Sequence, residues 1–402
     1  MKITKLETIR VDEFKSIIWV QVYTDEGFVG LGETWYAPQT VEAAIHELFS
    51  PILVGRDPLA IEKHWYDMFR LNDHFGYGGA ETRAISAIDT ALWDIAGQAA
   101  KQPIYNMLGG ACRDKIRIYN TCGSYGDIQD GKLVFDDPVG LAKSLLAEGI
   151  TAMKCSPTDF LAEASQGQYL SSHDLDRALE PIRKIREAVG NTIAIANDGH
   201  AKWNLPNAIR IAQAMDPYDM MWQEELLSTF NVDSHVRLAE NSKAPICVAE
   251  RLISRYQYRE FIEKGAAEIV MPDLIWTGGV SETKKIATLA SVYQLPVCPH
   301  DATGPVNVFA CAHICMNIPN AMLMETVRAY YKGWYGRFVE PNLTIVDGFL
   351  LAPEGPGLGT RLRPEVRKRP DVTIHASDAS EEFPLRSPSP TYQWSLETRR
   401  QV

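Results

Sequence analysis

The sequence predicts an α/β protein in which a closed parallel barrel follows a smaller α+β domain. From about residue 115 onward, short apolar runs alternate with helical patterns, as they do where helices join parallel strands. Six polar side chains end these runs at intervals of 26, 26, 23, 27 and 25 residues, about one strand, one helix and two loops. The residues before the alternation lack it, and 402 residues are too many for one small core.

The N-terminal α+β domain is assigned to residues 1–114. Its first 34 residues predict a meander of strands, with a turn at Asp25-Glu26-Gly27 between two apolar runs. A helical pattern follows and runs without proline as far as Pro103. Its apolar face is formed by Ile85, Ile88, Leu92, Ile95 and Ala99.

The barrel is assigned to residues 115–328. The predicted strands are Ile116–Asn120, Ile150–Lys154, Thr192–Ala196, Asp219–Trp222, Ile246–Ala249, Ile269–Met271, Pro296–Cys298 and Met322–Met324. Because helical stretches separate these eight runs, they predict a modified TIM-type (β/α)7β barrel. Enzymes of this architecture carry their chemistry at the carboxyl ends of the strands.

Two segments follow the barrel. Residues 329–375 contain one strand pattern and a turn-rich crossing at Pro353–Gly359, and we expect them to return to the N-terminal domain. Residues 376–402 are rich in Ser, Pro, Glu and Arg, so we expect a surface tail that is ordered only against a neighbouring subunit.

Composition excludes several classes of protein. A net charge of −11 argues against a nucleic-acid surface, which needs clustered Lys and Arg. The seven cysteines are scattered without a Cys-x-x-Cys pair, so neither a structural zinc site nor a disulfide framework is expected. No leader pattern and no apolar run of 18 residues are present, and we expect a cytoplasmic protein without membrane contact.

Three carboxylates end three successive predicted strands: Asp198, Glu224 and Glu250. Carboxylates brought together repel each other, and a divalent cation removes that conflict. Hard oxygen ligands favour Mg²⁺, with Mn²⁺ as an alternative. Each acid could instead cap a helix or join a salt bridge. Glu225 competes with Glu224, since adjacent side chains of a strand face opposite ways.

Two predicted strand ends carry a second pair, Asp273 and His300. A carboxylate behind an imidazole fixes its tautomer and raises its basicity, which makes a general base. His200 lies two residues beyond Asp198 and is a second proton-transfer group or a metal ligand. Glu325 ends the last strand, where it could hydrogen-bond a substrate carboxylate oxygen if it, or that oxygen, carries a proton.

Lys154 closes the second predicted strand. Its ammonium could neutralise a substrate carboxylate, act as a base if its pKa were depressed, or pair with an acid of the barrel.

Several segments together resemble the enolase superfamily, mandelate racemase subgroup, and most of all its acid-sugar dehydratases of the galactonate and mannonate type. They are Asp198-Gly199-His200, Gln223-Glu224-Glu225, Ala249-Glu250-Arg251-Leu252, Met271-Pro272-Asp273-Leu274, Gly278-Gly279-Val280, Pro299-His300 and Met324-Glu325. Gly27 to Glu33 and Pro103 through Gly110 resemble the family's capping domain, so the resemblance runs from residue 1 to about 375.

The resemblance implies Mg²⁺ held by Asp198, Glu224 and Glu250, proton abstraction by His300 with Asp273, and Glu325 beside an enediolate. It also implies that the histidine of the Asp-x-His segment, His200, is a general acid. Two departures stand out: Ser156 replaces the second lysine of the Lys-x-Lys that racemases carry, and Leu226 replaces the proline of Glu-Glu-Pro.

The expected activity is that of a hydro-lyase acting on an aldonate or aldarate. Abstraction of the C2 proton gives a metal-stabilised enediolate, and loss of the 3-hydroxyl gives a 2-keto-3-deoxy acid. Hydroxide needs a proton donor to leave, and His200 supplies one. An epimerase, racemase or cycloisomerase using the same intermediate is the alternative, with Ser156 speaking against a two-base mechanism.

Substrate contacts are expected where the first domain closes the barrel mouth. Candidates are the loop at Lys15–Ile18 and the side chains of Trp35, Tyr36, Asp73, His74, Tyr77, Trp203 and Trp222. Each could equally serve interdomain packing. The expected partners are a small sugar acid and, as is usual in the family, further copies of the chain in a homo-oligomer.

Overall fold

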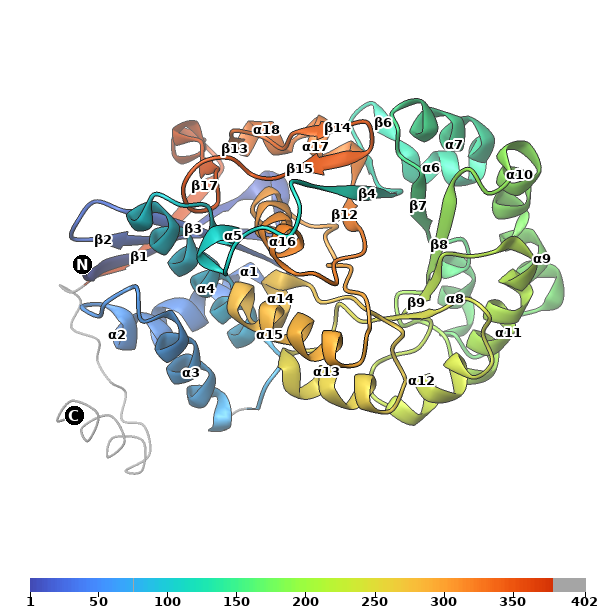
Figure 1. Cartoon of the computed structure of the whole chain (residues 1–402), viewed down its shortest axis with the longest axis horizontal. Helices are drawn as coiled ribbons and strands as arrows, with labels where there is room; N and C mark the ends of the chain where they lie inside the picture. The colour runs from blue at the N-terminus through green and yellow to red at the C-terminus, as the bar shows by residue number, and fades with distance from the viewer. Residues whose placement is uncertain (75, 379–402) are drawn as a thin grey trace.

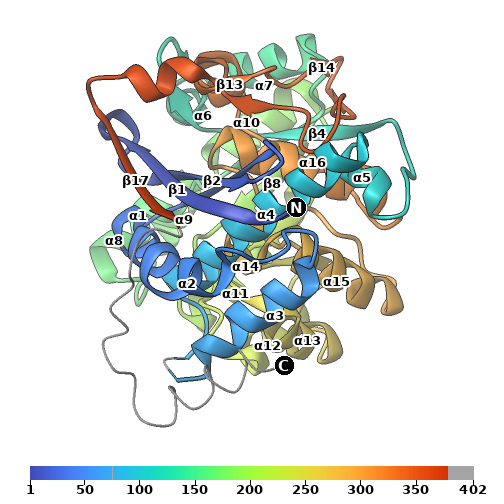
Figure 2. The ribbon, with the colours of Figure 1, turned by 90° about the vertical axis from the view of Figure 1, so that its left-hand side faces the viewer.

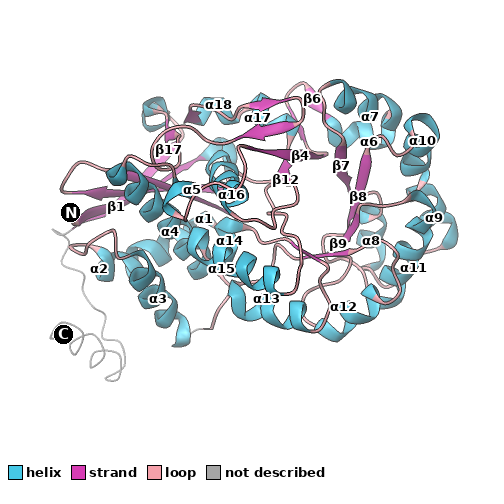
Figure 3. Ribbon diagram, viewed as in Figure 1, coloured by secondary structure: helices cyan, strands magenta, loops and turns pink. Residues whose placement is uncertain are grey.

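The computed structural model describes residues 1–74 and 76–378. Two parts lie side by side in Figure 1, a sheet with helices at the left and a ring of strands and helices at the right. In Figure 3 the strands of the ring lie inside and its helices outside. Within the described residues, no helix is both long and apolar enough to cross a membrane.

The capping domain is built on the antiparallel sheet β17-β1-β2-β3. Its strands are β1 (Ile3–Val11), β2 (Ile17–Thr24), β3 (Val29–Trp35) and β17 (Val372–Asp378). The first three confirm the predicted meander, since β1 pairs with β2 and β2 with β3. Figure 2 shows β17, β1 and β2 side by side.

One long helix, α4 (Ala80–Ala100), packs on this sheet. Its apolar side chains Ile85, Ile88 and Leu92 are buried in one cluster with Ile18 and Val20 of β2. A side chain at Gly30 or Gly32 of β3 would collide with carbonyl oxygens of α4, so these glycines permit the close approach.

Shorter elements complete the domain. They are η1 (Asp12–Phe14), α1 (Pro38–Ala43), η2 (Ala44–Phe49), α2 (Ser50–Leu53), α3 (Ile61–Leu71), η3 (Asn72–His74) and α5 (Ile104–Met107).

The barrel strands run in the order β4, β7, β8, β9, β10, β11 and β12, and all their mutual pairings are parallel. They are β4 (Lys115–Thr121), β7 (Ala152–Cys155), β8 (Ala194–Asp198), β9 (Trp222–Glu224), β10 (Ile246–Val248), β11 (Ile269–Val270) and β12 (Met324–Thr326). Val297 bridges Val270 and Ala321 in the remaining gap, and β12 pairs with β4. The closed ring confirms the predicted barrel.

Several strands lie nearer the carboxyl end than predicted. The run Asp219–Trp222 is observed as Trp222–Glu224, and Met322–Met324 as Met324–Thr326. The apolar runs in the sequence indicate which residues are buried, whereas the bounds of a strand are set by its hydrogen-bonded pairing with the neighbouring strands. Glu224 and Glu325 therefore lie inside their strands rather than after them.

The helices that alternate with these strands surround the ring (Figure 3). They are α6 (Asp130–Asp136), α7 (Pro138–Ala147), α8 (Asp159–Ser165), α9 (Ser172–Ala178), α10 (Glu180–Val189), α11 (Leu205–Met215), η4 (Asp216–Tyr218), α12 (Val232–Ala239), α13 (Ser254–Glu263), α14 (Leu274–Thr277), α15 (Gly279–Val292) and α16 (Pro305–Asn317). A small hairpin, β5 (Ser124–Tyr125) and β6 (Ile128–Gln129), follows β4.

Large and sulfur-bearing side chains fill the barrel interior. Tyr119, Trp222, Cys247, Met271 and Cys298 form one buried cluster there. The rings of Tyr119 and Trp222 meet edge to face, with centroids 5.2 Å apart. The interior is therefore a packed core that supports the strand ends above it.

The segment after β12 leaves the barrel and reaches the capping sheet, shown in red in Figure 1. Its elements are α17 (Arg328–Gly333), α18 (Tyr335–Phe338), β13 (Val339–Glu340), β14 (Ile345–Val346), β15 (Phe349–Leu351), β16 (Arg361–Leu362) and η5 (Pro364–Lys368). The last strand, β17, pairs with β1, which places Ala376–Asp378 in the sheet rather than in the predicted tail. The rest of that tail, residues 379–402, lies outside the described residues, and the divisions at 114 and 328 stay predictions.

Candidate active site

The six periodic residues and Lys154 come together at the carboxyl ends of the barrel strands, and all seven are buried. Asp198 and Glu224 are directly paired neighbours on β8 and β9. Glu325 lies on β12, and Asp273 bridges His300 across the gap that follows β11. The parallel barrel therefore collects residues that are distant in the sequence.

Lys154 lies at the centre of this acidic group. Its Nζ is 2.5 Å from Glu224 Oε1, 2.9 Å from Glu325 Oε1 and 3.5 Å from Asp198 Oδ2. Burial acts to lower the pKa of Lys154, but the surrounding carboxylates outweigh it and raise the pKa well above the usual value. The ammonium is thus held charged, which argues against a lysine base.

Glu250 completes the acidic group and lacks a full set of partners. Its Oε1 is 3.0 Å from Arg251 Nη1, whereas its buried Oε2 has no hydrogen-bond partner. Burial, then the charges of Asp198 and Glu224, raise the pKa of Glu250 well above its usual value. A buried carboxylate oxygen without a donor would be satisfied by a cation.

The donor set fits a hard divalent cation. Among residues 1–74 and 76–378, no three His, Cys, Asp or Glu side chains already converge as a finished metal site, since the Lys154 ammonium stands between Asp198 and Glu224. The three acids nevertheless offer oxygen ligands from consecutive strands, and Glu250 Oε2 is unpaired. Oxygen ligands in this number suit Mg²⁺.

Glu224 and Glu225 have different surroundings. Glu224 accepts a 2.8 Å hydrogen bond from Trp222 Nε1 and faces Lys154. Burial, with the charges of Asp198 and Glu325, raises the pKa of Glu224 to about 7 against the pull of Lys154. Glu225 has a φ of +35° and pairs with Arg251. The geometry thus groups Glu224, not Glu225, with the other acids.

His300 and Asp273 form the predicted dyad. His300 Nδ1 is 2.7 Å from Asp273 Oδ2, and Asp273 Oδ1 accepts from the Ile275 N–H at the start of α14. His300 Nε2 is 3.9 Å from Glu250 Oε2 and 4.0 Å from Glu325 Oε2. The carboxylate therefore orients the ring with Nε2 toward the acidic group.

His200 reaches the acidic group from β8. Its Nε2 is 3.2 Å from Asp198 Oδ2, and its Nδ1 is 2.6 Å from Asp159 Oδ2. Burial acts to lower the pKa of His200, but Asp198 and Asp159 outweigh it and raise the pKa. A histidine whose protonated form is favoured by two carboxylates is suited to donate a proton.

Glu325 is held as an anion. Thr121 Oγ1 donates to its Oε1, and the Asp301 N–H donates to its Oε2 at 2.7 Å. Burial acts to raise the pKa of Glu325, but Lys154 and His300 outweigh it and lower the pKa to about 2.

The residues predicted to contact substrate are dispersed. Tyr36, at the end of β3, is half-exposed and its ring is 5.8 Å from that of Trp276, which lies beside His300. Trp35 lies next to it, with its ring 6.4 Å from that of Tyr36. These two belong to the mouth of the barrel.

The other candidates have different surroundings. Asp73 follows α3, pairs with Arg70 and accepts from Tyr77, and His74 lies in the same turn. Trp203 and Trp222 are buried; Trp222 belongs to the barrel interior beneath Glu224. Side chains two residues apart on a strand face the same way, so Trp222 lies on the same face as Glu224, one layer lower in the barrel. Contact of these residues with a substrate stays a prediction.

Glu33 is a buried carboxylate that the sequence reading left without a role. It comes from β3 of the capping domain and accepts from the N–H groups of Val306 and Asn307 at the start of α16, and from Trp19 Nε1 at 2.8 Å. Burial is the main cause that raises the pKa of Glu33 to about 8. The carboxyl joins the capping domain to the helix that follows His300.

Glu33→Gln should flatten the pH dependence of stability. The pKa rises from 4.5 to about 8 on folding, so the contribution of Glu33 is fully present below pH 4.5 and is lost as pH rises through 8. The slope is at most about 1.4 kcal/mol per pH unit. Urea unfolding at pH 5, 6.5 and 8 should show that the free energy of unfolding of the variant, relative to that of the wild type, increases with pH. The same pH dependence in both proteins would contradict the raised pKa of Glu33.

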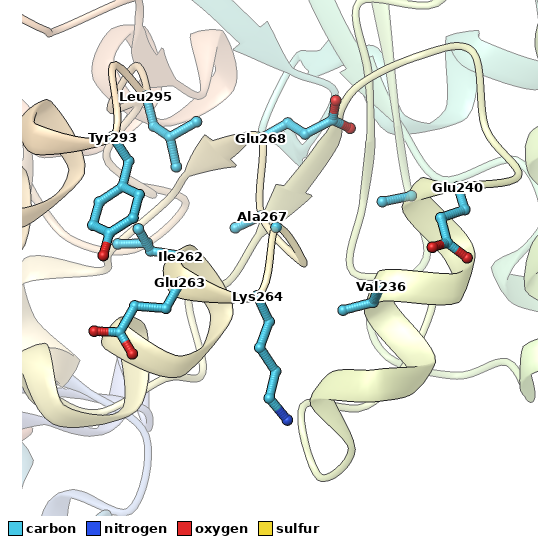
Figure 4. A pocket seen from close by; sticks show the side chains of 11 residues that line it. Val236, Glu240, Ile262, Glu263, Lys264, Ala267, Glu268, Tyr293 and Leu295 are labelled. Atoms are coloured by element: carbon cyan, nitrogen blue, oxygen red, sulfur yellow. The ribbon is translucent and has the colours of Figure 1, made fainter.

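A hollow of about 600 Å³, shown in Figure 4, is lined by none of these residues. Glu240, Lys264 and Tyr293 on its wall follow the ends of α12, α13 and α15, and Glu268 precedes β11. These positions belong to the amino ends of the strands, opposite the acidic group.

Comparisons with known proteins agree with the fold. Residues 7–109 match the family described as the mandelate racemase / muconate lactonizing enzyme N-terminal domain, and residues 139–366 match the enolase C-terminal domain-like family. A solved enolase of the mandelate racemase subgroup from Agrobacterium tumefaciens is similar, with a TM-score of 0.88, 45% identity and coverage of 94% of this chain and 99% of that chain.

Two curated relatives cover most of the chain. One is a D-galactonate dehydratase from Ralstonia pickettii (strain 12J), 33% identical over 366 residues, or 89% of this chain and 91% of the relative. The other is a D-xylonate dehydratase from Haloferax volcanii, 31% identical over 363 residues, or 90% of this chain and 87% of the relative.

Proposed function

The chain belongs to the enolase superfamily, and from that membership we propose that it is a Mg²⁺-dependent dehydratase of a sugar acid, either an aldonate or an aldarate. The observation that carries the proposal is the placement of two histidines with different partners around one acidic group. His300 is oriented by Asp273, and His200 lies between Asp198 and Asp159. Dehydration needs one base and one acid.

Asp198, Glu224 and Glu250 would hold the magnesium ion, as the unpaired Glu250 Oε2 supports. When bound, the ion stabilises negative charge that develops on the substrate carboxylate. Lys154 adds a fixed positive charge for the same carboxylate, and its raised pKa keeps that charge in place. Glu325, ionised and fixed by Thr121 and Asp301, orients the Lys154 ammonium.

The proton transfers are assigned to the histidines. His300 Nε2 takes the proton from C2. The C–H electron pair becomes the C1=C2 bond of an enediolate, and the π pair of the carboxylate moves onto its oxygen. When the carboxylate re-forms, the C1=C2 pair becomes a C2=C3 bond and the C3–O bond breaks, and the departing hydroxyl takes a proton from His200 and leaves as water. The resulting enol tautomerises to a 2-keto-3-deoxy acid.

A screen tests this proposal directly. Hexonates, pentonates and aldarates are incubated with the protein and Mg²⁺, and formation of 2-keto-3-deoxy product is measured. At least one sugar acid should give that product. Deuterium exchange at C2 with every candidate but no elimination would instead indicate an epimerase. A cytoplasmic location and a homo-oligomeric state stay predictions.

Replacing His200 with glutamine should separate the two steps. Dehydration should fall about 10²- to 10³-fold because the leaving hydroxyl loses its acid. Exchange of the C2 proton with solvent should continue, since His300 is unchanged. Proton NMR in D₂O, alongside a product assay, measures both. The exposed His173→Gln is the matched control; equal loss of exchange and elimination would contradict the role of His200.

A further inference from the structure

A second cation, which comes from the capping domain, lies near the pair of His300 and Asp273. Arg83, in the first turns of α4, places its guanidinium 4.2 Å from the centre of the Trp276 ring. The Trp276 ring is in turn 5.2 Å from the imidazole of His300. The Trp276 ring therefore lies close to both the guanidinium and the imidazole of the base.

Within the described residues the Arg83 guanidinium has no carboxylate in direct contact, although the charges of Asp273 and Glu250 act on it from farther away. It donates one hydrogen bond, from Nη1 to the Trp35 carbonyl at 2.7 Å, although a guanidinium carries five N–H donors. In the described part of the chain, no carboxylate lies within ion-pair distance of it. Arg251, an arginine beside the acidic group, is by contrast paired with Glu225 and Glu250.

Contacts with neighbouring residues also position the Arg83 guanidinium. Trp276 supports one face of the guanidinium, the Tyr36 ring centre is 5.8 Å away, and the Trp35 carbonyl fixes one edge. Burial of the half-buried side chain lowers the pKa of Arg83, yet an arginine stays charged at neutral pH. A partly buried charge without a partner is costly, and such costs are typical of binding sites.

The proposed chemistry orders the substrate relative to this cation. The C1 carboxylate lies against Lys154 and the C2 hydrogen against His300 Nε2, so the remaining carbons extend from the strand ends toward the capping domain. Arg83 comes from that domain. A guanidinium held in place can donate two parallel hydrogen bonds to a carboxylate, and the opposite charges attract. A primary hydroxyl carries no charge and cannot accept the same pair of bonds.

We propose that Arg83 binds the second, terminal carboxylate of a dicarboxylic sugar acid, so that the substrate is an aldarate rather than an aldonate. This inference rests on the proposed dehydratase function. It separates this chain from the two curated relatives, which are named for the aldonates galactonate and xylonate.

The test compares an aldarate with the aldonate of the same configuration, which differ only at the terminal carbon. The pairs cover the hexose configurations, and kcat and KM are measured with Mg²⁺ for wild type, Arg83→Gln and Arg83→Lys. Arg259→Gln, which removes an exposed arginine paired with Glu263 on α13, is the control. Thermal unfolding of each variant monitors the fold.

The wild type should favour one aldarate over its aldonate by at least about tenfold in kcat/KM. Arg83→Gln should lower kcat/KM for the aldarate about 10- to 100-fold, mainly through KM, and change the aldonate less than threefold. The kcat/KM of Arg83→Lys for the aldarate should lie between those of the wild type and Arg83→Gln, because lysine keeps the charge but cannot donate two parallel hydrogen bonds.

Two results would overturn the inference while the dehydratase function stands: wild-type preference for an aldonate, or equal losses on both substrates in Arg83→Gln. Absence of a 2-keto-3-deoxy product from every sugar acid would instead overturn the function itself, and the inference with it.

Discussion

His300→Asn should lower the rate of dehydration by about 10²- to 10⁴-fold. The imidazole Nε2 faces Glu250 and Glu325 at 3.9 and 4.0 Å, where the C2 hydrogen of a bound acid would lie. An asparagine amide can still donate to Asp273 but cannot accept a proton at that place. Substrate binding should change little, so the loss should fall on kcat rather than on KM.

The measurement pairs a product assay with deuterium exchange at C2. Both should disappear together in His300→Asn, unlike in His200→Gln, where exchange continues. Asp273→Asn is the informative companion: the ring loses the carboxylate 2.7 Å from Nδ1 that orients it, so a smaller loss with an altered pH profile is expected. Full turnover in His300→Asn would show that another group removes the proton.

Glu250→Gln should abolish the stabilisation of the protein by Mg²⁺. A ligand that binds only the folded state adds about 2.7 kcal/mol at one hundred times its Kd, which appears as a rise in unfolding temperature. The variant keeps the size of the side chain but removes a charged ligand. Wild type should therefore show a Mg²⁺-dependent shift that the variant lacks, together with loss of dehydration.

Without metal, the order of stability of the wild type and Glu250→Gln should be reversed. Burial and its acidic neighbours raise the pKa of Glu250, so without metal the wild type loses stability as pH rises above the usual glutamate value of 4.5. Glutamine does not ionise, and the variant should be the more stable of the two at pH 8. Glu240→Gln, at the opposite end of the barrel, controls for nonspecific cation binding. Equal Mg²⁺ shifts in both variants and wild type would refute the metal site.

Sequence reasoning found the residues that repeat with the strands. Asp198, Glu224 and Glu325 lie at or next to the carboxyl ends of barrel strands, because residues repeated at a constant interval in the chain reach the same end of the barrel. The dyad was found for the same reason, because Asp273 and His300 occupy bridged positions.

Residues outside that period were missed. Asp159 lies at the start of α8 and Arg83 on a helix of another domain, and nothing in their neighbourhood separates them from surface charges. The only available signal for Arg83 was its place in the first turns of an otherwise apolar helix. Trp222 shares the face of Glu224 and lies in the barrel interior beneath it, a depth that the sequence did not indicate, since the alternation of a strand gives the face and not the layer.

The pairing of β17 with β1 affects the order in which the protein forms. Thr8 and His375, which contact each other across these strands, are 367 positions apart. A ribosome therefore completes the barrel before it delivers the strand that covers the outer edge of β1, and contacts so distant in sequence form slowly. A nascent chain halted before residue 372 would expose an open strand edge, the kind of surface that recruits other chains into aggregates.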